Sequence, residues 1–282
     1  MGTAALLALA SAALHASWNL IVKTSADREL AAWGQFLFGS LLFLPFLVYV
    51  GLPPGPAWGF LIASGLIHLA YVEGLVRAYH HGDFSFAYPL ARGGGALSGA
   101  LIGAIVLGDT MRPWAWVALG VVAVGLLSLV RPGATRASIG WAAFTAVVIG
   151  TYSAIDAAGV RHSGDGIGER FGYGISLTLC AAVALSVVGC ARGRGGEFVL
   201  MIRTKWPTVA LSGLCLTGAY SLVLVAVSIP DVPLGYVATL RESSVVFGAL
   251  IGWVFLKERL GRARLASSTV VLAGMVWLIA IG

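Results

Sequence analysis

The chain has 282 residues, of which 59% are hydrophobic and only 11% are charged, and its mean hydropathy is +0.91. A soluble domain carries about 25% charged residues, so this composition excludes an ordinary water-soluble fold. The formal charge is +6, but the basic residues occur in short groups between apolar segments. That pattern is typical of membrane topology and not of a nucleic-acid-binding face. We therefore expect a multi-pass protein of the cell membrane (inner or plasma).

Apolar segments of about 20 residues, the length of a membrane-spanning helix, recur along the chain between short polar or Pro/Gly-containing stretches. None shows the two-residue alternation of a barrel strand, so helices are expected throughout. The first segment lacks a preceding basic region and is expected to remain as a span, not a cleaved signal. The ten predicted spans are residues 3–22, 30–50, 57–79, 84–107, 113–130, 137–158, 167–190, 206–228, 232–256 and 262–281.

The sequence contains an internal repeat. The string GALIG occurs at residues 99–103 and again at 248–252, an offset of 149 positions. The same offset, with a one-residue slip for the last pair, matches four further pairs of like chemistry: Arg92 with Arg241, Asp109 with Glu258, Tyr71 with Tyr220, and Tyr88 with Tyr236. Residues 1–131 and 137–282 are therefore expected to be two copies of one five-helix unit.

Because five is an odd number of spans, the second copy must enter the membrane in the opposite orientation. Inverted repeats are a frequent plan of secondary transporters, whose substrate site lies near the midplane between the repeats. The expected fold is thus an all-α membrane protein with ten transmembrane helices, arranged as two inverted five-helix repeats around a central cavity.

The distribution of basic residues predicts the orientation. Loops after odd-numbered spans hold 13 Lys and Arg residues, whereas loops on the other side hold 3. The remaining two, Arg92 and Arg241, lie within predicted spans. Since basic loops stay in the cytoplasm, both termini are predicted to lie outside.

The repeated segments read AYPLARGGGALSGALIGAIVLGD and LRESSVVFGALIGWVFLKE, each followed by a short apolar closing helix, and the first span ends in HASWNLIVK. In these features the chain resembles the EamA-type, ten-span members of the drug/metabolite transporter (DMT) superfamily over nearly its whole length. The resemblance implies a cavity lined by spans 1, 3, 4, 6, 8 and 9, with spans 5 and 10 peripheral. Many members have both termini in the cytoplasm, opposite to the charge-based prediction.

Ionisable side chains inside predicted spans are costly in lipid and are candidates for function. Arg92 and Arg241 occupy equivalent positions in the two copies, and arginine presents a fork of donors that matches a carboxylate or phosphate. We expect one or both to bind an anionic group of a substrate, with Glu242 beside them. The alternative is an internal ion pair, for example of Arg92 with Glu242 or Glu73.

Two acids are candidates for carrying a coupled proton. Asp156 lies well inside its span, with Tyr152 one helical turn before it on the same face, and hydrogen bonding between helices is the alternative. Glu73 lies one turn before Arg77, an order that also favours a structural salt bridge.

Further candidates for the cavity wall are aromatic or polar. His15 and Asn19 share one face of the first span, beside Trp18. The others, for which packing without substrate contact is the alternative, are His68, Tyr71, Tyr88, Tyr220 and Tyr236. Glycines at every fourth residue, such as Gly95, Gly99 and Gly103, predict close helix packing.

We expect no cofactor, metal or catalytic group. His80, His81 and Asp83 have no further ligand nearby in sequence, and no HExxH, GxSxG or nucleotide-binding loop occurs. A membrane-embedded enzyme and a channel or partner subunit are the competing classes. The expected partners are the bilayer and a small anionic or zwitterionic metabolite, such as an amino acid. Export is one possible direction of transport, and the monomer is one possible oligomeric state. A permease for organic acids or phosphonates is the alternative.

Overall fold

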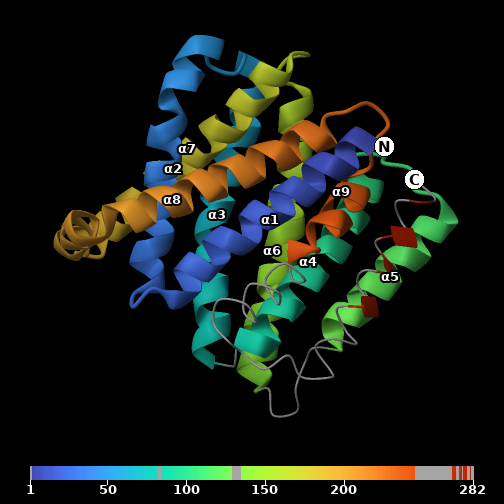
Figure 1. Cartoon of the computed structure of the whole chain (residues 1–282), viewed down its shortest axis with the longest axis horizontal. Helices are drawn as coiled ribbons and strands as arrows, with labels where there is room; N and C mark the ends of the chain where they lie inside the picture. Colours follow the sequence, from blue (N-terminus) through green and yellow to red (C-terminus); the bar gives the residue numbers. More distant parts are fainter. Residues whose placement is uncertain are drawn as a thin grey trace.

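The computed structural model describes residues 2–81, 84–128 and 135–244, with isolated positions between 269 and 280. Every regular element in these residues is an α-helix (Figure 1). The helices are α1 (Gly2–Thr24), α2 (Arg28–Val50), α3 (Gly55–His81), α4 (Phe84–Val106), α5 (Pro113–Leu127), α6 (Arg136–Arg161), α7 (Ile167–Ala191), α8 (Gly195–Val227) and α9 (Leu234–Arg241).

Six of the described helices, α1, α2, α3, α6, α7 and α8, are long and apolar enough to cross a membrane. Large apolar side chains point outward from the bundle; Val48 and Ile105, for example, are 77% and 80% exposed. Soluble proteins rarely present extended apolar surface of this kind to water. The chain is therefore a multi-pass α-helical membrane protein.

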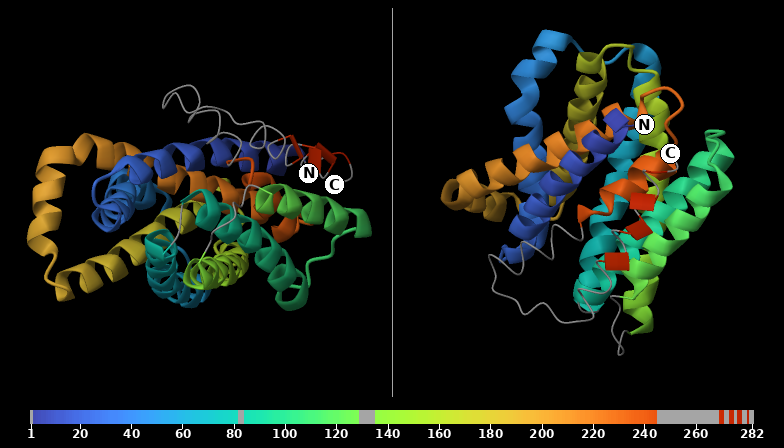
Figure 2. Two further views of the ribbon diagram at one scale, coloured as in Figure 1. Left: turned by 90° about the horizontal axis from the view of Figure 1, so that it is seen from below. Right: turned by 45° about the vertical axis from the view of Figure 1, so that its right-hand side comes forward.

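The observed helices α1 to α7 begin within two residues of the predicted spans. The prediction for the eighth span was wrong at its start, because α8 begins at Gly195 instead of residue 206. Phe198 anchors this additional segment by stacking on Trp33 at 3.7 Å between ring centroids. Figure 2 shows the beginning of α8, in gold, at a steep angle to the rest, and Pro207 lies inside the helix, where proline removes a hydrogen bond and bends the axis.

Only the start of the predicted ninth span is described, as α9. The rest of that span, the second GALIG at 248–252, and Glu258 lie outside the described residues, as does the tenth span apart from isolated positions. The described helices therefore correspond to the first eight predicted spans and the start of the ninth.

Close helix packing organises the bundle. Helix α1 packs along α8, α3 along α6, α2 along both α7 and α8, and α4 along α6; both views show α1 and α8 side by side (Figures 1 and 2). A Cβ on Gly150 would lie 2.7 Å from the backbone nitrogen of Gly99, and a Cβ on Gly95 would lie 2.7 Å from Ile149. The predicted packing role of the span-4 glycines is confirmed for Gly95.

The end of the bundle that holds the N-terminus of α1 is tightly packed. Apolar side chains from α1, α5, α6, α8 and α9 form one buried cluster there, which we call the closed-end cluster; it includes Ala4, Ala118, Ala157, Val227 and Val237.

A polar contact also joins three elements at this end. Asp109, after α4, accepts a hydrogen bond from Arg161 at the end of α6 at 3.1 Å. It also accepts one from the backbone N–H of Leu234, the first residue of α9, at 2.8 Å. We call this contact the Asp109 junction. Together with the closed-end cluster, it seals this end of the bundle.

Candidate functional site

A cavity lies among α1, α2, α3, α6, α7, α8 and α9. It contains about 870 Å³ of empty space including its open side, and about 70 Å³ is open to the centres of water-sized molecules. One water needs about 10–15 Å³ by that measure, so the cavity has room for about five to seven waters. Its size therefore suits a small solute.

The mouth of the cavity is at the end opposite the Asp109 junction. Its lining includes Val22 near the end of α1, the exposed Arg28 at the start of α2, and Val76 in the last part of α3. Helix α7 ends and α8 begins on this side as well, with Arg192 and Arg194 in the turn between them. The cavity is thus accessible from the basic side of the bundle.

The deep end of the cavity contains Arg241, the last residue of α9. This arginine is only 6% exposed, and its guanidinium carbon lies 5.8 Å from the centre of the Tyr220 ring. Within the described part of the chain, its Nε has no hydrogen-bond partner and no carboxylate lies within ion-pair distance. The site therefore presents a buried cation that lies against an aromatic face.

Arg92 is placed differently, although it occupies the equivalent repeat position. It donates to Glu242 at 2.7 Å and does not line the cavity. The internal ion pair, which was the alternative for Arg92, is the arrangement observed. Glu242 borders a smaller space between α4, α6, α8 and α9, which Arg241 also borders. In this space about 20 Å³ is open to the centres of water-sized molecules, compared with about 70 Å³ in the cavity.

Aromatic side chains from three helices form one wall of the cavity. His68 and Tyr71 come from α3, Tyr152 from α6 and Tyr220 from α8. The ring centroids of His68 and Tyr152 are 4.4 Å apart, those of Tyr71 and Tyr152 5.7 Å, and those of Tyr152 and Tyr220 6.1 Å. The sequence singled out these four residues separately, and the structure brings them together.

Asp156 lies behind this wall. It is fully buried, does not line the cavity, and accepts a hydrogen bond from the Tyr220 hydroxyl. The Tyr220 ring in turn lies against Arg241. A single tyrosine therefore contacts both the buried acid and the buried cation.

The first helix contributes part of its predicted set. His15 and Trp18 line the cavity and pack edge to face, with ring centroids 4.7 Å apart. Asn19 does not line it; its side chain donates to the carbonyl of His15 at 2.8 Å within the helix.

One predicted wall residue, Tyr236, is placed away from the cavity. It is 2% exposed, belongs to the closed-end cluster and is not among the described residues that line the cavity. It packs there because α9 begins at that end of the bundle. The side chain of Tyr88, and all of Asp83, lie outside the described residues.

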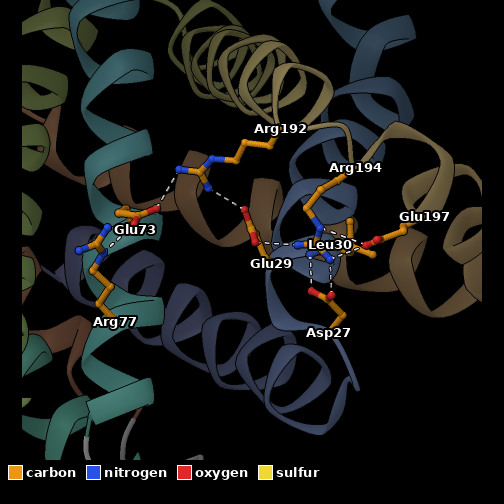
Figure 3. Close-up of polar contacts among 8 residues, drawn as sticks. All are labelled: Asp27, Glu29, Leu30, Glu73, Arg77, Arg192, Arg194 and Glu197. Atoms are coloured by element: carbon orange, nitrogen blue, oxygen red, sulfur yellow. Dashed lines mark hydrogen bonds and ion pairs between the residues drawn. The ribbon is translucent and has the colours of Figure 1, made fainter.

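Glu73 belongs to a group of charged side chains on the mouth side, which we call the charged cluster (Figure 3). It pairs with Arg77 at 2.6 Å, as the sequence spacing favours, and also with Arg192 at 3.2 Å. Arg192 reaches on to Glu29 at 2.9 Å. Glu73 does not line the cavity, and its role in proton coupling stays a prediction.

The second half of the charged cluster is centred on Arg194, in the turn between α7 and α8. It donates to Asp27 at 2.5 Å, Glu29 at 2.6 Å and Glu197 at 2.8 Å. The hydrogen bonds with Glu197 and Asp27 raise the pKa of Arg194 above its ordinary value. Partial burial alone would raise the pKa of Asp27, but hydrogen bonds from Leu30 N–H and Arg194 hold it below 3.8. The cluster joins α2, α3 and the α7–α8 turn beside the mouth.

Sequence reasoning missed the contributions of α2 and α7. Gln35 is 2% exposed, lines the cavity and accepts a hydrogen bond from Ser212 at 2.7 Å. Thr178 of α7 and Ser11 of α1 also line it. Gln35 was detectable, because an amide inside an apolar span needs a partner. Among the side chains that the structure describes, the cavity also differs from the set of spans implied by the resemblance, since those of α4 border the smaller space and not the cavity.

In the described ranges, no group of three His, Cys, Asp or Glu side chains converges as metal ligands would. The groups that the cavity offers a ligand are one buried guanidinium, imidazole and amide side chains, hydroxyls and aromatic faces. These groups can bind and orient a solute that carries negative charge.

No family model matches the chain, and no curated protein sequence matches it. Among solved structures, the chain is similar to a crystal structure of a protein with a TM-score of 0.72 and 15% sequence identity. The likeness covers 100% of this chain and 98% of the other. At this identity the similarity shows a common fold alone, and that fold extends over both chains from end to end.

Proposed function

We propose that the chain is a secondary transporter of a small anionic or zwitterionic metabolite, working by alternating access. In this proposal it has ten transmembrane helices in two inverted repeats and belongs to the EamA-type branch of the DMT superfamily. The observation that carries the proposal is a cavity open at one end of the bundle, containing the buried Arg241 at its deep end, and sealed at the other end. Secondary transporters bind their substrates in central cavities of this kind.

The pattern of helix packing supports an inverted duplication. If the first five helices exchange with the second five, α1 corresponds to α6 and α3 to α8. The packing of α1 along α8 then corresponds to that of α6 along α3, and both are observed. The contacts of α2 with α7 and of α4 with α9 are those expected across an axis that relates the two halves.

The two ends of the bundle supply the elements that alternating access requires. The mouth side is open at Arg28 and flanked by the charged cluster, while the other end is held by the Asp109 junction and apolar packing. By the charge rule the mouth would face the cytoplasm. Rocking of one repeat against the other would exchange the open and sealed ends.

The test is transport in proteoliposomes. A panel of amino acids, organic acids and phosphonates is first screened by thermal stabilisation, because a ligand of the folded state raises its melting temperature. Solutes that stabilise the protein are then offered in radiolabelled form to proteoliposomes and to empty liposomes. We expect protein-dependent flux of chemically unchanged solute that saturates with concentration. Folded protein that moves no stabilising solute, or that converts it chemically, would contradict the proposal.

A further inference from the structure

We infer that the cavity selects a small monocarboxylate with an apolar body over a zwitterion, a dicarboxylate or a neutral solute. This inference rests on the proposed function and narrows its substrate class. Its first support is the charge of the side chains that face the cavity.

Among the described lining residues, Arg241 is the buried cation, and no described carboxylate lies within ion-pair distance of it. Arg241 is 6% exposed, and its Nε is without a hydrogen-bond partner in the described part of the chain. Burying a guanidinium without a counter-charge is unfavourable, so a carboxylate arriving from solution would supply the missing partner. The fork of the guanidinium matches the two oxygens of one carboxylate.

The described lining has no acid for an ammonium group. None of its described residues is Asp or Glu. Two buried acids of the described chain lie outside this lining: Glu242 pairs with Arg92, and Asp156 accepts the Tyr220 hydroxyl behind the wall. A zwitterion would therefore have to give up the hydration of its ammonium group without gaining a carboxylate contact.

The rest of the lining between the mouth and Arg241 is largely apolar. Phe36, Val72, Leu75, Val76 and Leu216 all face the cavity. A second carboxylate would find no second buried cation in the described lining, which disfavours dicarboxylates. An aliphatic or aromatic body would gain about 25 cal/mol for each Å² of apolar surface removed from water.

At the mouth, Arg28 is exposed and lines the entrance. A positive charge there raises the local concentration of anions but is largely screened at physiological ionic strength. We therefore assign selectivity to Arg241 and only the rate of entry to Arg28.

Four solutes with the same number of carbons separate the effects of one carboxylate, an added ammonium group and a second carboxylate: butyrate, butyramide, 2-aminobutyrate and succinate. Their affinities are measured by calorimetry on the purified wild-type protein, and their fluxes in proteoliposomes. We expect butyrate to bind about tenfold or more tightly than each of the others, a difference of about 1.4 kcal/mol. Equal or tighter binding of 2-aminobutyrate or succinate, or no binding of butyrate, overturns this inference.

Two variants test the assignment of residues. Arg241→Gln should bring the affinities for butyrate and butyramide to within about twofold of each other, whereas Arg28→Gln should preserve the tenfold preference. If Arg241→Gln does not fold, Leu75→Asp supplies the second test, because a carboxylate in the lining should improve 2-aminobutyrate binding relative to butyrate. If Leu75→Asp folds and its affinities for 2-aminobutyrate and butyrate keep the wild-type ratio, the inference is contradicted.

The outcomes for this inference and for the proposed function are distinguishable. Flux of some other solute from the wider panel, with no preference for butyrate, overturns the monocarboxylate inference and leaves the transporter proposal intact. Selective binding of butyrate without flux of any solute supports the inference about the cavity and contradicts transport.

Discussion

Arg92 of α4 donates a 2.7 Å hydrogen bond to Glu242, which directly follows α9, and both side chains are 4% exposed. The two residues are 150 positions apart in the chain, so their pair joins the two predicted repeats. A buried pair of this kind is more sensitive to the loss of one partner than to the loss of both, because a single deletion leaves a buried charge without its partner.

The first prediction concerns this pair. Glu242→Leu should destabilise the folded protein by about 3–5 kcal/mol, whereas the double variant Arg92→Met/Glu242→Leu should recover much of that loss. Unfolding in detergent, arranged as a double-mutant cycle, measures the coupling. Asp165→Asn is the control, because that carboxylate is fully exposed and 4.0 Å from Arg170. A double variant as unstable as the sum of the single losses would show that the pair is not coupled.

The second prediction uses two glycines on facing helices. An added methyl on Gly150 would lie 2.7 Å from the backbone nitrogen of Gly99, whereas one on Gly99 would lie 3.8 Å from the Cα of Gly150. Gly150→Ala should therefore destabilise the protein by about 1–3 kcal/mol through overpacking. Gly99→Ala should be neutral or slightly stabilising, since alanine favours the helix by about 1 kcal/mol. The melting temperatures of the two variants measure these changes in stability. Equal losses of stability in Gly150→Ala and Gly99→Ala would contradict the prediction.

The third prediction concerns pH. The pKa of Asp27 is lowered below 3.8 in the folded protein by hydrogen bonds from Leu30 N–H and Arg194, which outweigh the opposing effect of partial burial. The stabilisation from its charge is therefore present above pH of about 4 and is lost as pH falls through the folded-state pKa. Asn caps a helix about as well as Asp, so Asp27→Asn removes the charge and keeps the cap.

Melting curves between pH 3 and 7 test this prediction. The wild-type protein should be more stable than Asp27→Asn at pH 7, and the difference should shrink as pH falls below about 4. High salt at pH 7 should also reduce the difference, because the pair is partly exposed. A difference that is constant across this pH range would show that the charge of Asp27 contributes nothing.

The fourth prediction concerns the sealed end. Asp109→Ala removes the acceptor for both Arg161 and the N–H of Leu234. If the junction stabilises the sealed state by about 1 kcal/mol, its loss should raise the population open at this end on the order of fivefold. A single cysteine at Ala238, which borders the smaller space beneath the junction, reports the change through its rate of reaction with a membrane-impermeant thiol reagent.

This measurement needs a background without Cys180, Cys190 and Cys215, the free cysteines of the described chain. Asp165→Ala serves as the matched acid-to-alanine control, because Asp165 is fully exposed. Labelling of Asp109→Ala at the control rate would mean that apolar packing alone seals this end.

The helices were largely predictable, because a bilayer requires about 20 apolar residues for each span and few other patterns meet that demand. The start of α8 was missed because Arg203, Lys205 and Pro207 have the composition of a loop. The stacking of Phe198 on Trp33, 165 positions away, extends the helix there, and such a contact has no signature in local sequence.

In the site, the sequence identified His68, Tyr71, Tyr152, Tyr220 and Arg241, all of which line the cavity. It could not distinguish Arg241 from Arg92, because repeat symmetry makes them equivalent. The difference arises from neighbouring positions in the chain. Consecutive residues near a helix end point about 100° apart, so Arg241 lines the cavity while Glu242 pairs with Arg92.

The bend in α8 has a consequence for how the molecule sits in the bilayer. A straight helix of 33 residues would be about 50 Å long at about 1.5 Å per residue, which exceeds the hydrocarbon thickness of about 30 Å. We therefore expect the segment before Pro207 to run along the membrane surface, with Arg203 and Lys205 at headgroup level and the exposed Trp206 as an interfacial anchor. This segment fixes the depth and tilt of the bundle, so quenching of Trp206 fluorescence by lipids brominated at graded positions should be strongest near the headgroups.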